Sequence, residues 1–211
     1  MIALRKFAIC DRGASGAEFA LTLPLLLILL LGTVDAGRFL WEVNRAEKAT
    51  QMGARYAVVT SPVSTGLINA DFESAGLSAG DLIPADMIGK LECTRSTCTC
   101  TDCAVTVGSA VDTARFDAIV ARMQAMDPTI EADNVRVIYR GSGFGFAGDA
   151  GGGGGGGGGG ATETMEISPL VTVSLVNVPF QPITSFMLAS VTLPAFSTTL
   201  TAEDASGEYS N

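Results

Sequence analysis

The residue best placed for chemistry is Glu18, a carboxylate that stands directly before sixteen uncharged and mostly apolar residues, 19–34. A charge at the edge of a lipid-compatible segment is costly unless it is paired. A peptidase cut after Gly13 would free the amine of Ala14 and make Glu18 the fifth residue of the mature chain. In a bundle of parallel copies, that amine can meet the carboxylate of a neighbour, and the pair would favour one axial register. We therefore predict a processing site at Gly13 and Ala14, and an assembly role for Glu18.

The cysteines form a second cluster, with Cys93, Cys98, Cys100 and Cys103 within eleven residues, whereas Cys10 lies in the part that the cut would remove. An oxidising compartment favours disulfides over thiolates, so we predict two disulfides. Four cysteines allow three connectivities, and the pairing stays open. Zinc binding and redox activity are the alternatives, although structural zinc sites usually join two separate ligand pairs.

Composition excludes several classes of function. The chain has no histidine, which removes Ser-His-Asp and Cys-His catalysis and histidine-bound metals. Its net charge is −9 and no cluster of Lys and Arg follows residue 60, which argues against nucleic-acid binding. The ten consecutive glycines at 151–160 precede a strand-like segment without a nearby lysine, so they do not match a phosphate-binding loop. We expect no catalytic residues, no cofactor, no metal and no small-molecule substrate.

The start of the chain has the features of a membrane or export segment. Residues 19–34 would span about 24 Å as a helix, slightly less than a bilayer core of about 30 Å. Arg5, Lys6 and Arg12 precede this run, which predicts a cytoplasmic amino terminus. A secretory signal cut before Gly37 and an uncleaved anchor remain as alternatives to the cut after Gly13.

These residues also carry a family resemblance. The order of a glycine, four residues, a glutamate and an aromatic, from Gly13 to Phe19, resembles the prepilin-peptidase site of Flp-class type IVb pilins. Residues 12–59 resemble the TadE-like minor pseudopilins of tight-adherence (Tad) pilus systems, and residues 169–180 and 198–206 are similar in character to that family's final strands. Phe19 replaces the tyrosine of major Flp pilins, and the chain is much longer than they are, so the resemblance favours the minor class.

The resemblance implies a structural protein of pilus assembly. It implies processing by a prepilin peptidase, residence in the bacterial inner membrane as a single-pass protein, and a carboxy-terminal domain in the periplasm. Its partners would be other pseudopilins or pilin and the pilus assembly platform, and Phe19 would share the assembly role of Glu18. The alternative from another class is a signal-anchored or secreted periplasmic binding module with a disulfide- or zinc-stabilised loop.

Beyond the apolar run, the sequence predicts that the helix continues. Apolar residues recur at helical spacing over residues 36–59, which favours packing on the protein's own domain and, near the membrane, contact with neighbouring subunits. Pro24 favours a kink, which helices in lipid tolerate. Asp35 and Arg38 are spaced as an exposed ion pair, to which we assign no function.

The remainder predicts a small α+β domain. Residues 111–126 have a helical apolar face that ends before Pro128, and residues 134–140, 170–178 and 196–202 have the alternation of strands. We expect a long amino-terminal helix, with its first half in the membrane, packed on a small antiparallel sheet. The expected organisation is a basic leader at 1–13, a transmembrane helix at 14–34, an amphipathic helix at 35–60, and a periplasmic domain at 61–211 with a disordered Gly-rich loop at 141–161.

Overall fold

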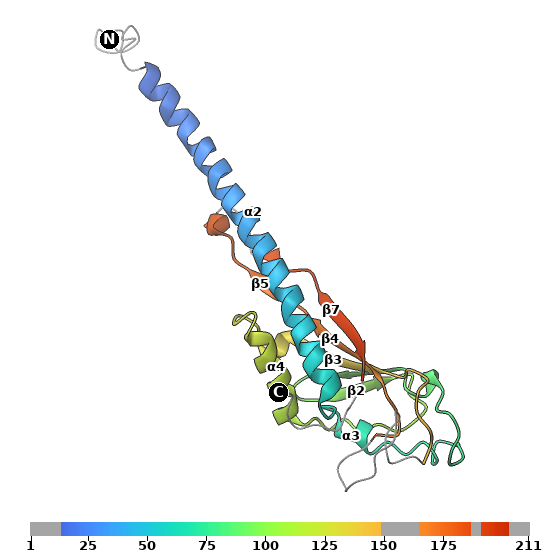
Figure 1. Ribbon diagram of the computed structural model, residues 1–211. Helices are drawn as coiled ribbons and strands as arrows, with labels where there is room; N and C mark the ends of the chain where they lie inside the picture. Colours follow the sequence, from blue (N-terminus) through green and yellow to red (C-terminus); the bar gives the residue numbers. More distant parts are fainter. Residues whose placement is uncertain (1–13, 149–164, 187–190, 203–211) are drawn as a thin grey trace, which may run out of the picture. The chain divides into compact units, whose positions relative to one another are not determined.

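The computed structural model describes residues 14–148, 165–186 and 191–202. Its first element is helix α2, Ala14–Val59, which runs for 46 residues. The helix includes Pro24 without being divided, although proline removes one backbone hydrogen bond. The expected apolar and amphipathic segments are thus parts of a single helix (Figure 1).

Helix α2 precedes a five-stranded antiparallel sheet with the strand order β2-β1-β3-β4-β7 (Figure 1). The strands are β1 (Lys90–Cys93), β2 (Cys98–Thr101), β3 (Val135–Arg140), β4 (Leu170–Leu175) and β7 (Phe196–Thr201). A second helix, α4, covers Thr113–Gln124. The short elements are α3 (Thr65–Ile68), η2 (Ala85–Met87), η3 (Ala132–Asn134), η4 (Ile183–Phe186) and a two-stranded pair of β5 (Pro179–Phe180) and β6 (Val191–Thr192). The α+β class with a long amino-terminal helix is therefore confirmed.

Small residues let the second part of α2 approach the sheet closely. The side chains of Ala46, Ala49 and Ala57 are buried, and so is Gly53. A Cβ added at Gly53 would lie 3.2 Å from Cγ1 of Val173 on β4. The buried face is narrower than the apolar pattern predicts, because two residues of that pattern are exposed, Leu40 at 62% and Met52 at 37%.

The core of the domain follows from alternation in the strands and from the apolar face of α4. In β3, Val135, Val137 and Tyr139 are buried while the residues between them are partly exposed. Helix α4 begins at a favourable N-cap, since the Asp112 carboxylate accepts hydrogen bonds from two backbone amides of its first turn. Its buried residues are Phe116, Ile119, Val120 and Met123.

Three predicted strands and the predicted helix correspond to β3, β4, β7 and α4, with small differences at their ends. Met126, expected on the apolar face of that helix, lies beyond its end and is 39% exposed. The prediction of disorder from residue 141 is wrong for residues 141–148, because bridges pair Leu82 with Phe146 and Gly145 with Ile167. Residues 149–161 of the predicted loop fall outside the described residues.

The chain divides into two compact units. We call Met1–Glu42 with Pro179–Val191 the helical unit, and Val43–Val178 with Thr192–Asn211 the sheet unit. Helix α2 contributes residues to both units. The helical unit therefore combines the start of the chain with a segment that follows β4 by only a few residues.

A buried tyrosine gives the first testable prediction. Tyr139 is 1% exposed, its hydroxyl accepts a hydrogen bond from the Val63 backbone amide at 3.0 Å, and burial raises its pKa, which keeps the phenol neutral. A Tyr139→Phe variant should leave that amide unpaired and lower the free energy of unfolding by about 1–3 kcal/mol, measured by denaturant unfolding in detergent. The matched control is Tyr56→Phe, which keeps the ring beneath Arg122. Equal losses in the two variants would contradict the role of the Tyr139 hydroxyl.

Candidate functional site

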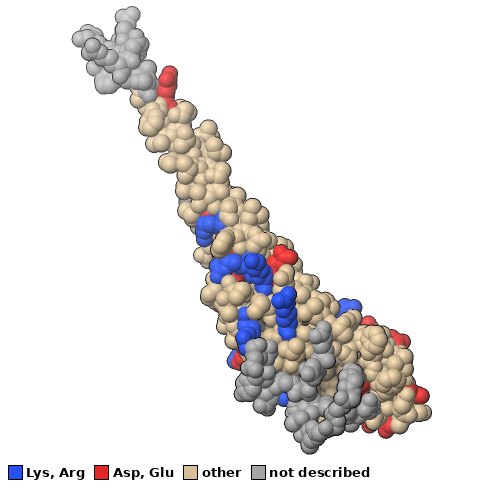
Figure 2. Space-filling model, viewed as in Figure 1, with Lys and Arg blue, Asp and Glu red and all other residues tan. Residues whose placement is uncertain are grey.

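Within the described part of the chain, no side chain from another element covers the first part of helix α2. Residues 16–34 are exposed throughout, except that Leu31 is half-exposed, and the largest values include 80% at Leu21 and 74% at Leu25. After the acidic atoms at its start, the visible face of this stretch is a continuous uncharged surface (Figure 2). By length and composition, α2 is apolar enough to cross a membrane. An apolar surface that is exposed along the length of residues 19–34 indicates contact with lipid or with other protein.

The predicted processing and assembly residues lie at the beginning of this surface. Gly13 falls outside the described residues, and Ala14 is the first residue of α2. Glu18 and Phe19 follow four and five residues later in the same helix. Both side chains are exposed, Phe19 at 63%. The carboxylate is thus displayed on the helix surface at the start of the apolar stretch.

The other end of the apolar stretch carries a carboxylate that is buried. Asp35 is only 7% exposed and accepts hydrogen bonds from the backbone amides of Ile183 at 2.8 Å and Thr184 at 2.9 Å. The Thr184 hydroxyl donates a third bond at 2.7 Å, and Arg38 Nη1 lies 3.3 Å away. These amides begin the short helix η4, so Asp35 satisfies donors that would otherwise lack partners at a helix start.

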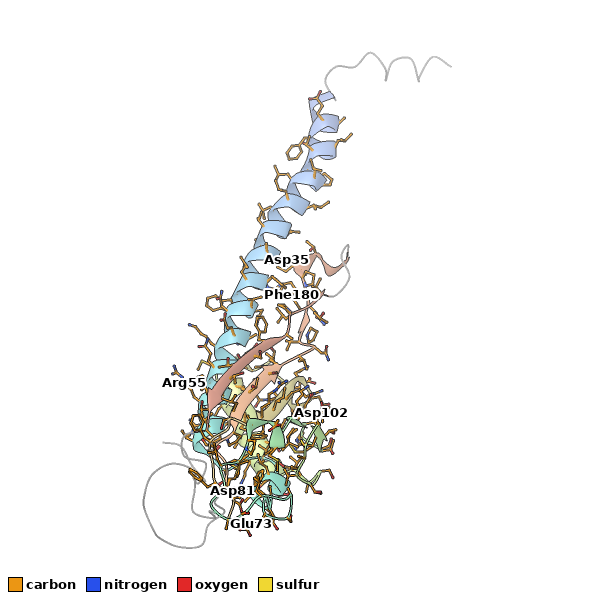
Figure 3. All side chains as sticks on the ribbon, turned by 90° about the vertical axis from the view of Figure 1, so that its right-hand side faces the viewer. Asp35, Arg55, Glu73, Asp81, Asp102 and Phe180 are labelled. Atoms are coloured by element: carbon orange, nitrogen blue, oxygen red, sulfur yellow. A yellow bond between two sulfur atoms is a disulfide. The ribbon has the colours of Figure 1, made fainter. Side chains whose placement is uncertain are left out.

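Aromatic contacts support the same attachment. The ring of Phe180 packs edge-on against Phe39 with ring centroids 5.4 Å apart. The guanidinium of Arg38 lies 5.6 Å from the centre of the Phe180 ring and donates to the Gln181 carbonyl at 3.4 Å. Figure 3 shows Asp35 and Phe180 at this place, on α2 and on the segment beside it. We call residues 179–184 the collar, because they contact α2 over a single turn, from Asp35 to Phe39.

The predicted pairing of Asp35 with Arg38 is confirmed, but the expectation that the pair is exposed is wrong for the carboxylate. The pair exists, but the carboxylate is buried by residues almost 150 positions later in the chain. Helical spacing contains no information about such a distant partner. One signal in the sequence is that residues 167–202, which include these partners, contain no Asp, Glu, Lys or Arg.

The four cysteines lie together in the sheet unit. The predicted assembly residues, Glu18 and Phe19, belong to the helical unit. Cys93 is bonded to Cys98, and Cys100 is bonded to Cys103. The first disulfide joins opposite residues of β1 and β2, and both of its cysteines are buried. The segment is therefore an edge hairpin of the sheet and not the loop that we expected. Zinc binds thiolates, whereas all four sulfurs here are in disulfides.

The buried disulfide gives a second prediction. Replacing both Cys93 and Cys98 by alanine should lower the free energy of unfolding by about 2 kcal/mol, because the short closed loop limits the unfolded chain. The same exchange at Cys100 and Cys103 is the control, because that disulfide also closes a short loop and its cysteines are only half-buried. Calorimetry or denaturant unfolding of each full chain measures the loss. An unchanged stability in the Cys93 and Cys98 variant would show that this disulfide does not stabilise the hairpin.

An ion pair joins the turn between β1 and β2 to helix α4. Arg95 Nε and Nη2 donate to the two carboxylate oxygens of Asp117 at 2.7 and 2.9 Å. These hydrogen bonds hold the pKa of Asp117 below its ordinary value of 3.8. Among the described residues, no group of three or more His, Cys, Asp or Glu is arranged to hold a metal ion.

This ion pair predicts a weak acid dependence. A carboxyl group with a lowered pKa in the folded state adds stability above its unfolded pKa, and that stability is lost as the pH falls through the folded pKa. We expect the contribution to disappear below pH 3.8, and to be small because both side chains are about half exposed. In Asp117→Asn, stability measured by unfolding at several acidic pH values should fall less steeply in this range. A slope identical to that of the unaltered protein would contradict the assignment.

The comparison with known proteins identifies the same part of the chain that carries the exposed apolar surface. A family model of TadE-like proteins matches residues 13–55, which include Glu18, the whole exposed apolar stretch and Asp35. No curated protein and no solved structure gives a match. TadE-like proteins are pilus assembly proteins and are not known as enzymes, so the match implies a role in Tad pilus assembly. Residues 13–55 of this chain are a TadE-like domain.

Proposed function

We propose that this protein is a pseudopilin of a Tad-type pilus, cut after Gly13 by a prepilin peptidase and assembled through its exposed helix. The observation that carries the proposal is the position of Glu18. Its side chain is exposed at the start of the apolar part of α2, within the TadE-like domain. A fibre subunit needs a surface that other subunits can cover, and this helix has one. Phe19 belongs to the same surface.

The chemistry of assembly follows from charge pairing. After the cut, the ammonium group of Ala14 and the carboxylate of Glu18 lie about one helical turn apart in one chain. Either charge alone is unfavourable in lipid, and pairing with a neighbouring chain removes that cost from both. Because only one axial offset brings the two groups together, the pair selects the register of the subunits.

The topology that fits this chemistry places the leader, residues 1–13, in the cytoplasm and residues 14–34 across the bacterial inner membrane. The positive charges of Arg5, Lys6 and Arg12 support this orientation. Residues 35–60 would leave the membrane as a helix, and residues 61–211 would form the periplasmic domain. Two disulfides in the sheet unit are consistent with an oxidising compartment.

The partners in this account are the prepilin peptidase, a sibling pseudopilin or pilin, and the assembly platform in the inner membrane. The acidic net charge and the absence of a Lys and Arg cluster after residue 60 disfavour nucleic acid as a partner. The competing function is a periplasmic binding module, anchored or secreted, with the cysteine hairpin as its stabilised part. That function would make no use of a cut after Gly13.

A complementation experiment separates the two functions. Cells that lack this chain should fail to assemble surface pili, which are measured in material sheared from the cells. A Gly13→Val copy should not restore pili, whereas Gly37→Val should, because it alters only the alternative signal site and a Cβ there meets no neighbouring atom. Normal pili in cells without the chain would refute the pseudopilin function and favour the binding module.

A further inference from the structure

The exposed apolar stretch of α2 is short for its task. Residues 19–34 cover about 24 Å, whereas the hydrocarbon core of a bilayer is about 30 Å thick. The next residue is Asp35, an acid at the place where the membrane should still surround the helix. A helix with this sequence needs either a thinner bilayer or a means of hiding that carboxylate.

The collar hides it. Three donors from Ile183 and Thr184 and the guanidinium of Arg38 surround the Asp35 carboxylate, which leaves the residue 7% exposed. A polar group whose hydrogen bonds are satisfied inside the protein is far less costly to place near lipid than an unsatisfied one. With the collar in place, the Asp35 carboxylate no longer fixes the point at which α2 must leave the hydrocarbon core.

The outer surface of the collar is itself suited to lipid. It contains no charged residue, and its Ile183 side chain is 49% exposed although Asp35 holds the backbone of that residue against the helix. Val191, in the same helical unit, is 48% exposed. Trp41 on α2 is 66% exposed, and tryptophan is enriched where membrane meets water. With the collar in place, the stretch from residue 19 to residue 41 offers about 35 Å of helix, which is enough for a bilayer.

We propose that the collar is a membrane-contacting element that lies in the outer interface of the bilayer, where Ile183 contacts phospholipid at the boundary between headgroups and acyl chains. Arg38 then extends toward the headgroups while the Phe180 ring remains below its guanidinium, as long basic side chains do at membrane surfaces. The partner is a phospholipid surface. This proposal rests on the insertion of α2 that the proposed function assumes, and it adds a second segment of chain to the membrane contact.

The test uses a single tryptophan as a depth reporter in the full chain. Trp41, the only tryptophan, is replaced by phenylalanine. Ile183→Trp is then introduced and the protein is placed in phospholipid nanodiscs. We expect blue-shifted emission, a loss of intensity with lipids spin-labelled near the headgroup, a smaller loss with lipids labelled near the acyl-chain ends, and little loss with iodide in the water.

Two matched reporters make each outcome decisive. In the same background, Leu27→Trp should be quenched most by the deep label, and Phe144→Trp, an exposed residue of the sheet unit, should be quenched by iodide alone. Iodide quenching at position 183 would overturn the proposal by placing the collar in water. Protection there from both iodide and lipid labels would also overturn it and indicate a protein contact. Failure of lipid quenching at position 27 would instead refute insertion of α2.

Discussion

A Glu18→Ala variant is expected to be cut after Gly13 and yet to be missing from sheared pili. The substitution leaves the cut site unchanged but removes the carboxylate that a neighbouring ammonium needs. An unpaired charge costs about 3 kcal/mol at the bilayer centre and less at its edge, where Glu18 lies. The upper limit of the loss is therefore roughly a hundredfold in an association equilibrium for each subunit contact. Immunoblots of the sheared and membrane fractions measure incorporation, and mass spectrometry of the membrane fraction measures cutting.

Two further substitutions separate charge from shape at this position. Glu18→Gln keeps the size of the side chain and removes the charge, so it should behave like Glu18→Ala. Glu18→Asp keeps the charge on a shorter side chain and should retain part of the incorporation. Normal pili with Glu18→Gln would show that charge pairing does not register the subunits.

An Asp35→Ala variant is expected to release the collar from α2. The backbone amides of Ile183 and Thr184 lose their acceptor, and their hydrogen exchange should rise to the rate of unprotected amides. The sheet unit should keep its slow exchange, because Asp35 and the collar belong to the helical unit. Hydrogen exchange with mass spectrometry of the full chain in nanodiscs resolves the two regions.

The control for this variant is Arg38→Gln. It removes the ion pair and the contact with the Phe180 ring, but it leaves all three collar donors on the Asp35 carboxylate. Exchange at Ile183 and Thr184 should therefore stay slow in Arg38→Gln. If both variants accelerate exchange equally, or if neither does, the three hydrogen bonds to Asp35 do not hold the collar.

Local patterns were sufficient to predict much of this fold. Helical periodicity identified α4, and alternation identified β3, β4 and β7, because one face of each element is less exposed than the other and the sequences show it. The hairpin of β1 and β2 was missed, since each strand has only four residues and β2 consists of cysteines and threonines, so the alternation in β1 is too short to stand out. Its pairing is set by the neighbouring strand β3 and by the Cys93–Cys98 disulfide, which joins β1 to β2.

The candidate site was predictable only where its parts are adjacent in sequence. Glu18 could be singled out because a carboxylate beside an apolar run is unusual in itself. The role of Asp35 could not, because its partners Ile183 and Thr184 come from the far end of the chain. A contact between distant segments is decided by tertiary packing, and neither spacing nor propensity encodes it.

The proposed assembly mechanism depends most on where the mature chain begins. Intact-mass measurement of the protein extracted from membranes of its native host tests this directly. We predict a single mature form whose first residue is Ala14, with Glu18 as its fifth residue. A chain that begins at Met1 or at Gly37 would contradict the pairing of a freed amine with a neighbour's Glu18, and the assembly mechanism with it.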